Sequence, residues 1–119
     1  MGYVRVRATI ANPLDRNLKE ELEFIVDTGA IYTVIPRNVA DRLQLKEVDK
    51  RRFKIASGET VEYPVSEAYV TVQGKGVTSL VAIAVEKTPV LLGVTTLELL
   101  GLQVDPIAGK LVPLELMIL

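Results

Sequence analysis

Residues 24–36 read Phe-Ile-Val-Asp-Thr-Gly-Ala-Ile-Tyr-Thr-Val-Ile-Pro, and the interpretation of the whole chain starts from this stretch. Three apolar residues lead to Asp27, and Thr28, Gly29 and Ala30 follow it. An apolar approach puts the carboxylate in a site of low dielectric, the small hydroxyl can bond to backbone, and Gly with Ala allows another chain to come close. These residue types suit a reactive carboxylate, although Asp-Thr-Gly alone also suits an ordinary turn at the end of a strand.

Strands are predicted on the N-terminal side of this stretch. Residues 3–11 alternate apolar and polar side chains, which indicates a strand with one buried face. Turn-forming residues occupy positions 12–17, and the alternation resumes over residues 18–26. The two runs therefore predict a hairpin whose second strand delivers the chain to Asp27.

The rest of the chain also favours strands. Residues 51–56 and 60–65 flank Ser57-Gly58-Glu59, which predicts a projecting hairpin, and Pro64 indicates that one of its arms has a free edge. Further predicted strands are 69–72, 77–85, 102–105 and 110–118.

Two short helices are predicted between these strands. Residues 37–45 place apolar side chains three and four positions apart. Thr95 with Glu98 is a capping-box pattern, and Gly101 stands where the end of a helix favours a left-handed residue. The opening pattern of apolar strand, glycine turn and short helix is echoed from residue 89 onward, which suggests two related halves of one domain.

The composition restricts the chemistry that the chain can perform. A length of 119 residues predicts one domain over residues 1–119, and the chain contains no cysteine and no histidine. Disulfides, thiol nucleophiles, thiolate or imidazole metal sites and the usual base of a serine nucleophile are therefore excluded. Any chemistry must therefore run on carboxylates, hydroxyls, lysines or the backbone.

The charge pattern argues against two classes of partner. The chain carries 14 basic and 15 acidic residues, so no net field attracts it to nucleic acid or to an anionic membrane. We interpret the basic run at residues 50–54, beside Glu47 and Asp49, as the solvated face of a strand. The near-zero net charge predicts no binding to nucleic acid or membrane, and the absence of a long apolar stretch predicts a cytoplasmic protein.

The order of these features resembles that of the retropepsin-like aspartic peptidases, the family of retroviral proteases and their cellular and prokaryotic single-domain relatives. Asp-Thr-Gly-Ala is followed by Thr33-Val34-Ile35-Pro36, a hairpin occupies the place of the family's flap, and Leu91-Leu92-Gly93 precedes a helix. The resemblance covers nearly the whole chain. It implies an all-β fold, a closed barrel of the acid-protease type with one or two short helices.

The resemblance also implies roles for individual residues. Asp27 matches the catalytic aspartate, Thr28 matches a hydroxyl that interlocks with its counterpart across a dimer axis, and Gly29 completes the catalytic motif. The residues that it places along a bound peptide are Gly29, Ala30, Ile31, Tyr32, Ser57, Gly58, Glu59, Thr88, Pro89, Val90 and Leu91.

The activity implied is that of a homodimeric aspartic endopeptidase acting on a peptide or protein. Two copies of Asp27 would share one proton and activate a water, because two adjacent carboxylates cannot both ionise easily. The implied mechanism needs no metal and no cofactor. The second apolar-glycine turn, residues 91–93, offers no aspartate, so one chain cannot supply the pair. The alternating C-terminal residues Leu114, Leu116 and Ile118 are expected to contribute to the dimer interface.

The sequence departs from the retroviral pattern at two places beside the motif. Retroviral members have acidic residues after Asp-Thr-Gly-Ala and arginine after the later glycine, whereas this chain has Ile31 with Tyr32 and Val94 with Thr95. The substrate subsites are therefore expected to differ. An alternative also stays open, a catalytically weak or inactive domain of the same fold that binds peptides or dimerises, although the intact Asp-Thr-Gly-Ala favours the enzyme.

Overall fold

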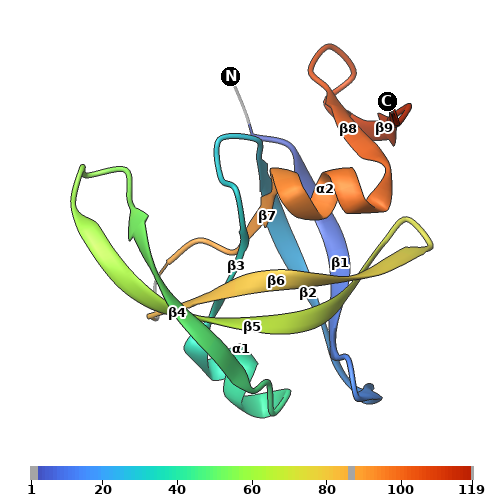
Figure 1. The fold of residues 1–119 in the computed structure, drawn as a ribbon. Coiled ribbons are helices and arrows are strands. Elements are labelled where there is room, and N and C mark those ends of the chain that lie inside the picture. The colour runs from blue at the N-terminus through green and yellow to red at the C-terminus, as the bar shows by residue number, and fades with distance from the viewer. Residues whose placement is uncertain (1–2, 86–87, 119) are drawn as a thin grey trace.

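The chain folds mainly into strands, and two short helices interrupt them (Figure 1). The computed structural model describes residues 3–85 and 88–118. The strands are β1 (Arg5–Asn12), β2 (Asp15–Asp27), β3 (Thr33–Pro36), β4 (Glu47–Lys54), β5 (Thr60–Val72), β6 (Lys75–Ala84), β7 (Leu91–Gly93), β8 (Leu102–Asp105) and β9 (Lys110–Pro113). The helices are α1 (Arg37–Arg42) and α2 (Val94–Leu100).

The main sheet closes on itself. Seven strands follow the order β1-β2-β7-β3-β6-β5-β4, and β1 also pairs with β5, so every strand except β4 belongs to a closed ring. Closure removes the free edges that an open sheet would expose to other chains. The all-β barrel predicted from the sequence is thus confirmed, and β8 and β9 form a separate two-stranded sheet.

The two halves of strand β5 pair with different strands. Residues 60–66 pair with β4, whereas residues 65–72 pair with β6 and residues 69–71 also with β1. The two strands predicted at 60–65 and 69–72 are therefore one continuous strand. On the β6 side the pairing begins at Val65, which leaves the free edge that Pro64 indicated.

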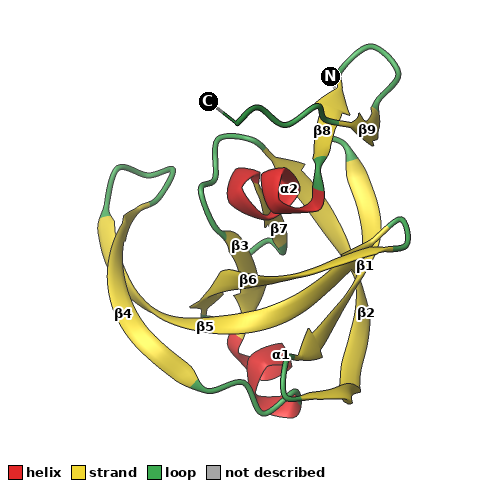
Figure 2. Cartoon of the chain, turned by 45° about the vertical axis from the view of Figure 1, so that its right-hand side comes forward, coloured by secondary structure: helices red, strands yellow, loops and turns green. Residues whose placement is uncertain are grey.

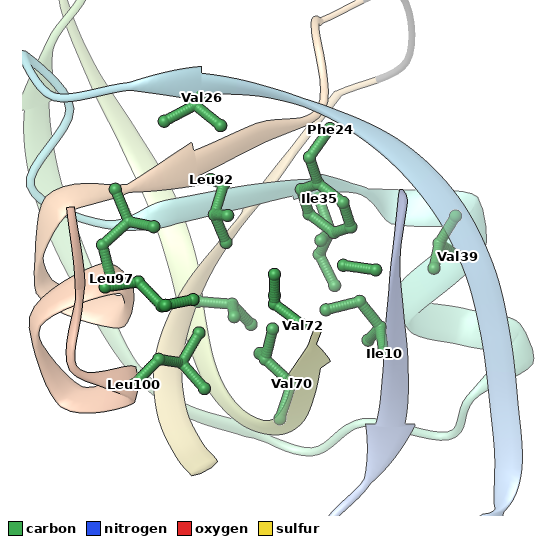
Figure 3. Packing of buried hydrophobic residues seen from close by; sticks show 14 of the residues in the cluster. Ile10, Phe24, Val26, Ile35, Val39, Val70, Val72, Leu92, Leu97 and Leu100 are labelled. Atoms are coloured by element: carbon green, nitrogen blue, oxygen red, sulfur yellow. The ribbon is translucent and has the colours of Figure 1, made fainter. Parts of the chain in front are cut away.

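The interior of the ring is filled by the apolar members of the alternating strands. Ile10, Phe24, Ile35, Val70 and Leu92 are all 0% exposed. Full burial of side chains of this size contributes about 1.5–3 kcal/mol each. In Figure 3 they converge in one cluster, which the apolar side of α2 closes with Leu97 and Leu100.

Helix α2 begins differently from the prediction. Its N-cap is Gly93 and no side chain caps it, so the predicted capping box of Thr95 and Glu98 is wrong. The helix follows β7 without a turn, which places Thr95 inside its first turn, where its N–H donates to the Ile31 carbonyl at 3.2 Å. The predicted left-handed end at Gly101 is confirmed by a φ of 71°.

The C-terminal strand is shorter than predicted. Strand β9 ends at Pro113, whereas the alternation predicted a strand to Ile118. Leu116, Met117 and Ile118 are 60%, 80% and 96% exposed. The alternating pattern continues beyond β9 but meets no partner strand within the described chain. Among all the described residues, no helix has the length and apolar character needed to cross a membrane.

Candidate active site

Asp27 stands at the end of β2, beside the short strand β7. The two strands run parallel, and their register pairs Asp27 with Gly93. Residues 25–27 and 91–93, which belong to the two halves of the apparent sequence repeat, are therefore neighbours in the same sheet. Asp27 is half-buried at this position.

The turn after β2 fixes the carboxylate. Oδ1 of Asp27 accepts the Gly29 N–H at 2.9 Å, and the Asp27 carbonyl accepts the Ala30 N–H at 3.1 Å. A Cβ at residue 29 would lie 3.2 Å from the same Oδ1 atom, tighter than most such contacts, so glycine suits the turn. Among the described residues no group of three or more acidic side chains could hold a metal ion.

Gly93 connects this loop to helix α2. The Ala30 carbonyl accepts the Val94 N–H at 2.8 Å, so the loop satisfies a donor of the first helical turn. A Cβ at Gly93 would lie 2.4 Å from the backbone carbonyl carbon of Tyr32, which is closer than any real contact. The glycine of Leu91-Leu92-Gly93 is thus required by the close approach of two backbones.

A buried cluster of hydroxyls lies behind this contact, and sequence analysis missed it. The Thr33 hydroxyl is 2.6 Å from that of Thr96, and the Thr96 hydroxyl is 2.9 Å from that of Ser79. Thr33 also accepts the Gly93 N–H at 3.0 Å. The three side chains join β3, α2 and β6 to the strand that faces Asp27, and no local sequence signal connects positions so far apart in the chain.

Replacing Thr96 with Val tests this cluster. The change keeps the shape of the side chain but removes the hydroxyl, so Thr33 and Ser79 each lose a buried partner. We expect Thr96→Val to lower the free energy of unfolding by about 1–3 kcal/mol, measured by urea denaturation. The matched control is Thr78→Val, at an exposed position of the same sheet, which should change it by less than about 0.5 kcal/mol. Equal stabilities of the two variants would contradict the assignment.

The other residues predicted around Asp27 differ in exposure. Thr28, Gly29 and Ile31 are exposed, with Ile31 at 62%, while Ala30 and Tyr32 are half-buried. The residues that share an open surface depression with Thr28 are Val4, Val26, Gln103, Val104 and Pro106.

The predicted tip residues lie at the end of the β4–β5 hairpin. Gly58 has a φ of 90°, and its N–H donates to the Ile55 carbonyl at 2.9 Å. Ser57 donates from its hydroxyl to the Glu59 carboxylate at 3.2 Å. In Figure 2 this hairpin projects from the barrel and curls toward the loop between β2 and β3.

The predicted residues before β7 adjoin the strand of Asp27. The Val90 carbonyl accepts the Ile25 N–H at 2.9 Å, and Leu91 is paired with the same residue. Pro89 is exposed and Thr88 is half-buried. The structure thus brings Val90 and Leu91 together with the Asp27 strand, whereas the hairpin tip belongs to a separate projection.

The hairpin contacts the loop of Asp27 through Tyr32. The rings of Tyr32 and Phe53 meet edge to face, with centroids 5.5 Å apart and planes at 67°. Phe53 also lies beside Tyr63, at 5.9 Å between centroids. Arg51 donates hydrogen bonds to the Tyr32 hydroxyl and, at 3.1 Å, to Asp49. The sequence indicated only a solvated strand face here. Arg51 is indeed exposed, but it also holds the Tyr32 hydroxyl and the Asp49 carboxylate.

These contacts also change the pKa values of two side chains in the hairpin. The pKa of Asp49 is lowered below its ordinary value of 3.8. The hydrogen bond from the Lys50 N–H has the largest effect, and the hydrogen bond from the Arg51 guanidinium has the next largest. Hydrogen bonds to Asp49 and then to Tyr32 raise the pKa of Arg51 above its ordinary value. Both groups are charged at neutral pH, so the ionic contact beside Tyr32 is maintained there.

Comparison with known proteins gives matches of two kinds, to a family model and to solved structures. A family model described as aspartyl protease matches residues 6–104. Among solved structures, the EIAV protease complexed with the inhibitor HBY-793 is similar to the chain with a TM-score of 0.61 and 22% sequence identity, over 84% of this chain and 89% of that one. At that identity the likeness concerns the fold. No curated protein matches the chain in sequence.

Proposed function

The chain belongs to the aspartyl protease family, and from this premise we propose that it is a homodimeric aspartic endopeptidase that hydrolyses peptide bonds with two copies of Asp27. The observation that carries the proposal is the position of this carboxylate. It ends an apolar strand, is held by the Gly29 N–H at 2.9 Å and remains half-buried beside Gly93. The β7 residue that pairs with Asp27 is Gly93, so this position supplies no second carboxylate.

In the proposed reaction the two carboxylates share one proton and bind a water between them. The unprotonated carboxylate takes a proton from the water, whose oxygen attacks the carbonyl carbon of the substrate. The protonated carboxylate donates a hydrogen bond to the developing oxyanion. A proton then passes to the leaving nitrogen, and the carbon–nitrogen bond breaks. The two groups can take opposite roles because adjacent carboxylates do not ionise together.

The exposed apolar surface supports the dimer. Leu116, Met117 and Ile118 continue beyond β9 with 60–96% of their surface exposed, and Leu99 of the adjacent helix is 53% exposed. Apolar surface of this kind marks an interaction site more often than a free face. A second copy could supply a partner strand for these residues, since a two-fold interface brings the same segment from both chains. Thr28 lines the same surface depression as Gln103 and Val104 of β8.

A second candidate function is a peptide-binding domain without useful turnover. The observation in its favour is the loop after the motif, where Ile31 is 62% exposed and Tyr32 is engaged by the hairpin. Such a domain would bind extended peptides and leave them intact.

A statine-type inhibitor, which mimics the tetrahedral transition state, tests the proposed enzyme. We expect it to block cleavage of an unfolded protein substrate at the pH of highest activity, because it places a hydroxyl between the two carboxylates. Titration calorimetry should give one inhibitor for two chains, as a site shared across an axis requires. Cleavage that persists under saturating inhibitor would contradict the proposal, and peptide binding without any cleavage would favour the second candidate.

A further inference from the structure

The β4–β5 hairpin is an arm with limited support from the barrel. Within the described residues, β4 pairs only with β5, and β6 pairs with β5 no further toward the tip than Val65. Figures 1 and 2 both show the arm extending away from the ring and curling back toward the loop that follows Asp27. An arm of this kind needs a tertiary contact to keep one position relative to the barrel.

The two faces of the arm differ in character. The register pairs Arg51 with Tyr63 and Arg52 with Glu62, so these pairs alternate between the faces. Phe53 and Tyr63 are half-buried, whereas Arg52 and Glu62 are exposed. The arm thus directs its aromatic face toward the body of the protein and its charged face toward solvent.

Tyr32 meets this aromatic face from the other side. It lies in the loop between Asp27 and β3, and the next residue, Thr33, is fixed by the buried hydroxyl cluster. Its backbone carbonyl carbon is packed against Gly93. The backbone of Tyr32 is therefore held in place, while its ring and hydroxyl extend to Phe53 and Arg51 of the hairpin.

We propose that Tyr32 is a positioning residue that holds the β4–β5 hairpin beside Asp27, through its edge contact with Phe53 and the hydrogen bond from Arg51. The consequence for catalysis rests on the proposed function, whereas the position of the arm is a property of the chain without substrate. When the contact is absent, the arm samples more positions, and substrate binding must include the cost of bringing it back. We expect a shift of about tenfold in the equilibrium between held and released arm, which corresponds to about 1.4 kcal/mol.

Spin labelling measures the arm directly. The chain has no cysteine, so Thr60→Cys on the arm and Lys19→Cys on β2, both exposed, introduce two labels without background. Diluting labelled chains with excess unlabelled chains restricts the measured distance to one subunit. We expect a narrow distance distribution in the parent protein, a broad one with Tyr32→Ala and an intermediate one with Tyr32→Phe, which keeps the ring and loses the hydroxyl.

Two further variants make the measurement decisive. Arg51→Ala changes an exposed residue of the arm, so it should broaden the distribution without affecting the barrel even if Tyr32→Ala fails to fold. The matched control is Arg16→Ala, which also removes an exposed arginine beside a tyrosine ring. The Arg16 guanidinium lies 3.6 Å from the Tyr69 ring centroid, and that of Arg51 lies 5.8 Å from the Tyr32 centroid. This control should leave the distribution unchanged. Distributions for folded Tyr32→Ala and Arg51→Ala that match the parent would overturn the proposal.

Kinetics provide the second readout. In an active enzyme, Tyr32→Ala should raise KM about tenfold and change kcat by less than about threefold, because the arm affects binding more than the proton transfers. Arg16→Ala should change neither. An unchanged KM with Tyr32→Ala would overturn the role in catalysis. A parent protein that cleaves no peptide would reject the proposed function. If Tyr32→Ala still broadens the distance distribution in that case, the positioning of the arm by Tyr32 is retained.

Discussion

Replacing Asp27 with Asn should abolish peptide cleavage and leave the fold intact. The amide has the shape of the carboxylate, and its oxygen can still accept the Gly29 N–H that Asp27 now accepts at 2.9 Å. It can neither take a proton from water nor share one with its counterpart. We expect kcat/KM to fall by at least about 10³-fold, since loss of general acid–base catalysis removes 10²–10⁴-fold and the paired group also loses its partner.

The measurement is cleavage of an unfolded protein substrate by purified parent and variant, with circular dichroism and thermal denaturation to verify the fold. Asp15→Asn is a suitable control, because it changes an exposed aspartate at the other end of the same strand. It should retain full activity. Cleavage that survives Asp27→Asn in a correctly folded protein would exclude the proposed enzyme.

Mixed dimers sharpen the same prediction. If both aspartates of a dimer are needed, an equal mixture of parent and Asp27→Asn chains that exchange freely should keep about a quarter of the activity of the same total amount of parent protein. Independent sites on single chains would keep about half. For a shared site, activity should vary with the square of the fraction of parent chain. For independent sites it should vary linearly, and a linear dependence would contradict the shared site.

Placing a charge in the exposed C-terminal segment should separate the subunits. Leu116 is 60% exposed in the single chain, so Leu116→Asp has little effect on the folding of one subunit. In the proposed dimer the same side chain is buried, and an unpaired carboxylate there costs several kcal/mol. We expect the dissociation constant of the dimer to rise at least about 100-fold, which corresponds to about 2.7 kcal/mol.

Sedimentation velocity over a range of concentrations measures this effect, and activity should disappear together with the dimer. Leu14→Asp is the matched control, because Leu14 is an apolar residue 85% exposed in the β1–β2 turn. It should leave both association and activity unchanged. A parent protein that sediments as a monomer while cleaving peptides would refute the dimer altogether.

Local patterns were enough to predict most strands, whereas the closed barrel was implied by the resemblance to the retropepsin-like family. Alternating side chains in β1 and β2 placed Ile10 and Phe24 inside, and both are fully buried. Turn chemistry was equally informative, because Gly58 and Gly101 adopt the left-handed backbone that only glycine takes readily. In these cases the decisive interactions lie within a few residues of one another.

Local patterns failed where a distant segment changed the outcome. The pairing of Thr95 with Glu98 is a valid helix start by itself, but β7 leads directly into α2 and the loop carbonyls take its free N–H groups. The alternation after Pro113 is a valid strand pattern, yet a strand exists only when a partner pairs with it. Both predictions ignored what stands beside the segment in space.

The sequence by itself determined that an apolar strand ends at Asp27 in a glycine turn and that most of the chain forms strands, and its resemblance to a known family implied the barrel. Only the tertiary structure decided that β7 lies against this strand, that Thr33, Ser79 and Thr96 join behind it, and that Tyr32 meets the arm at Phe53. The physical reason is the range of the interactions involved. Periodicity and turn preferences act between neighbours in the chain, whereas packing and buried hydrogen bonds join residues that meet only after the sheet has closed.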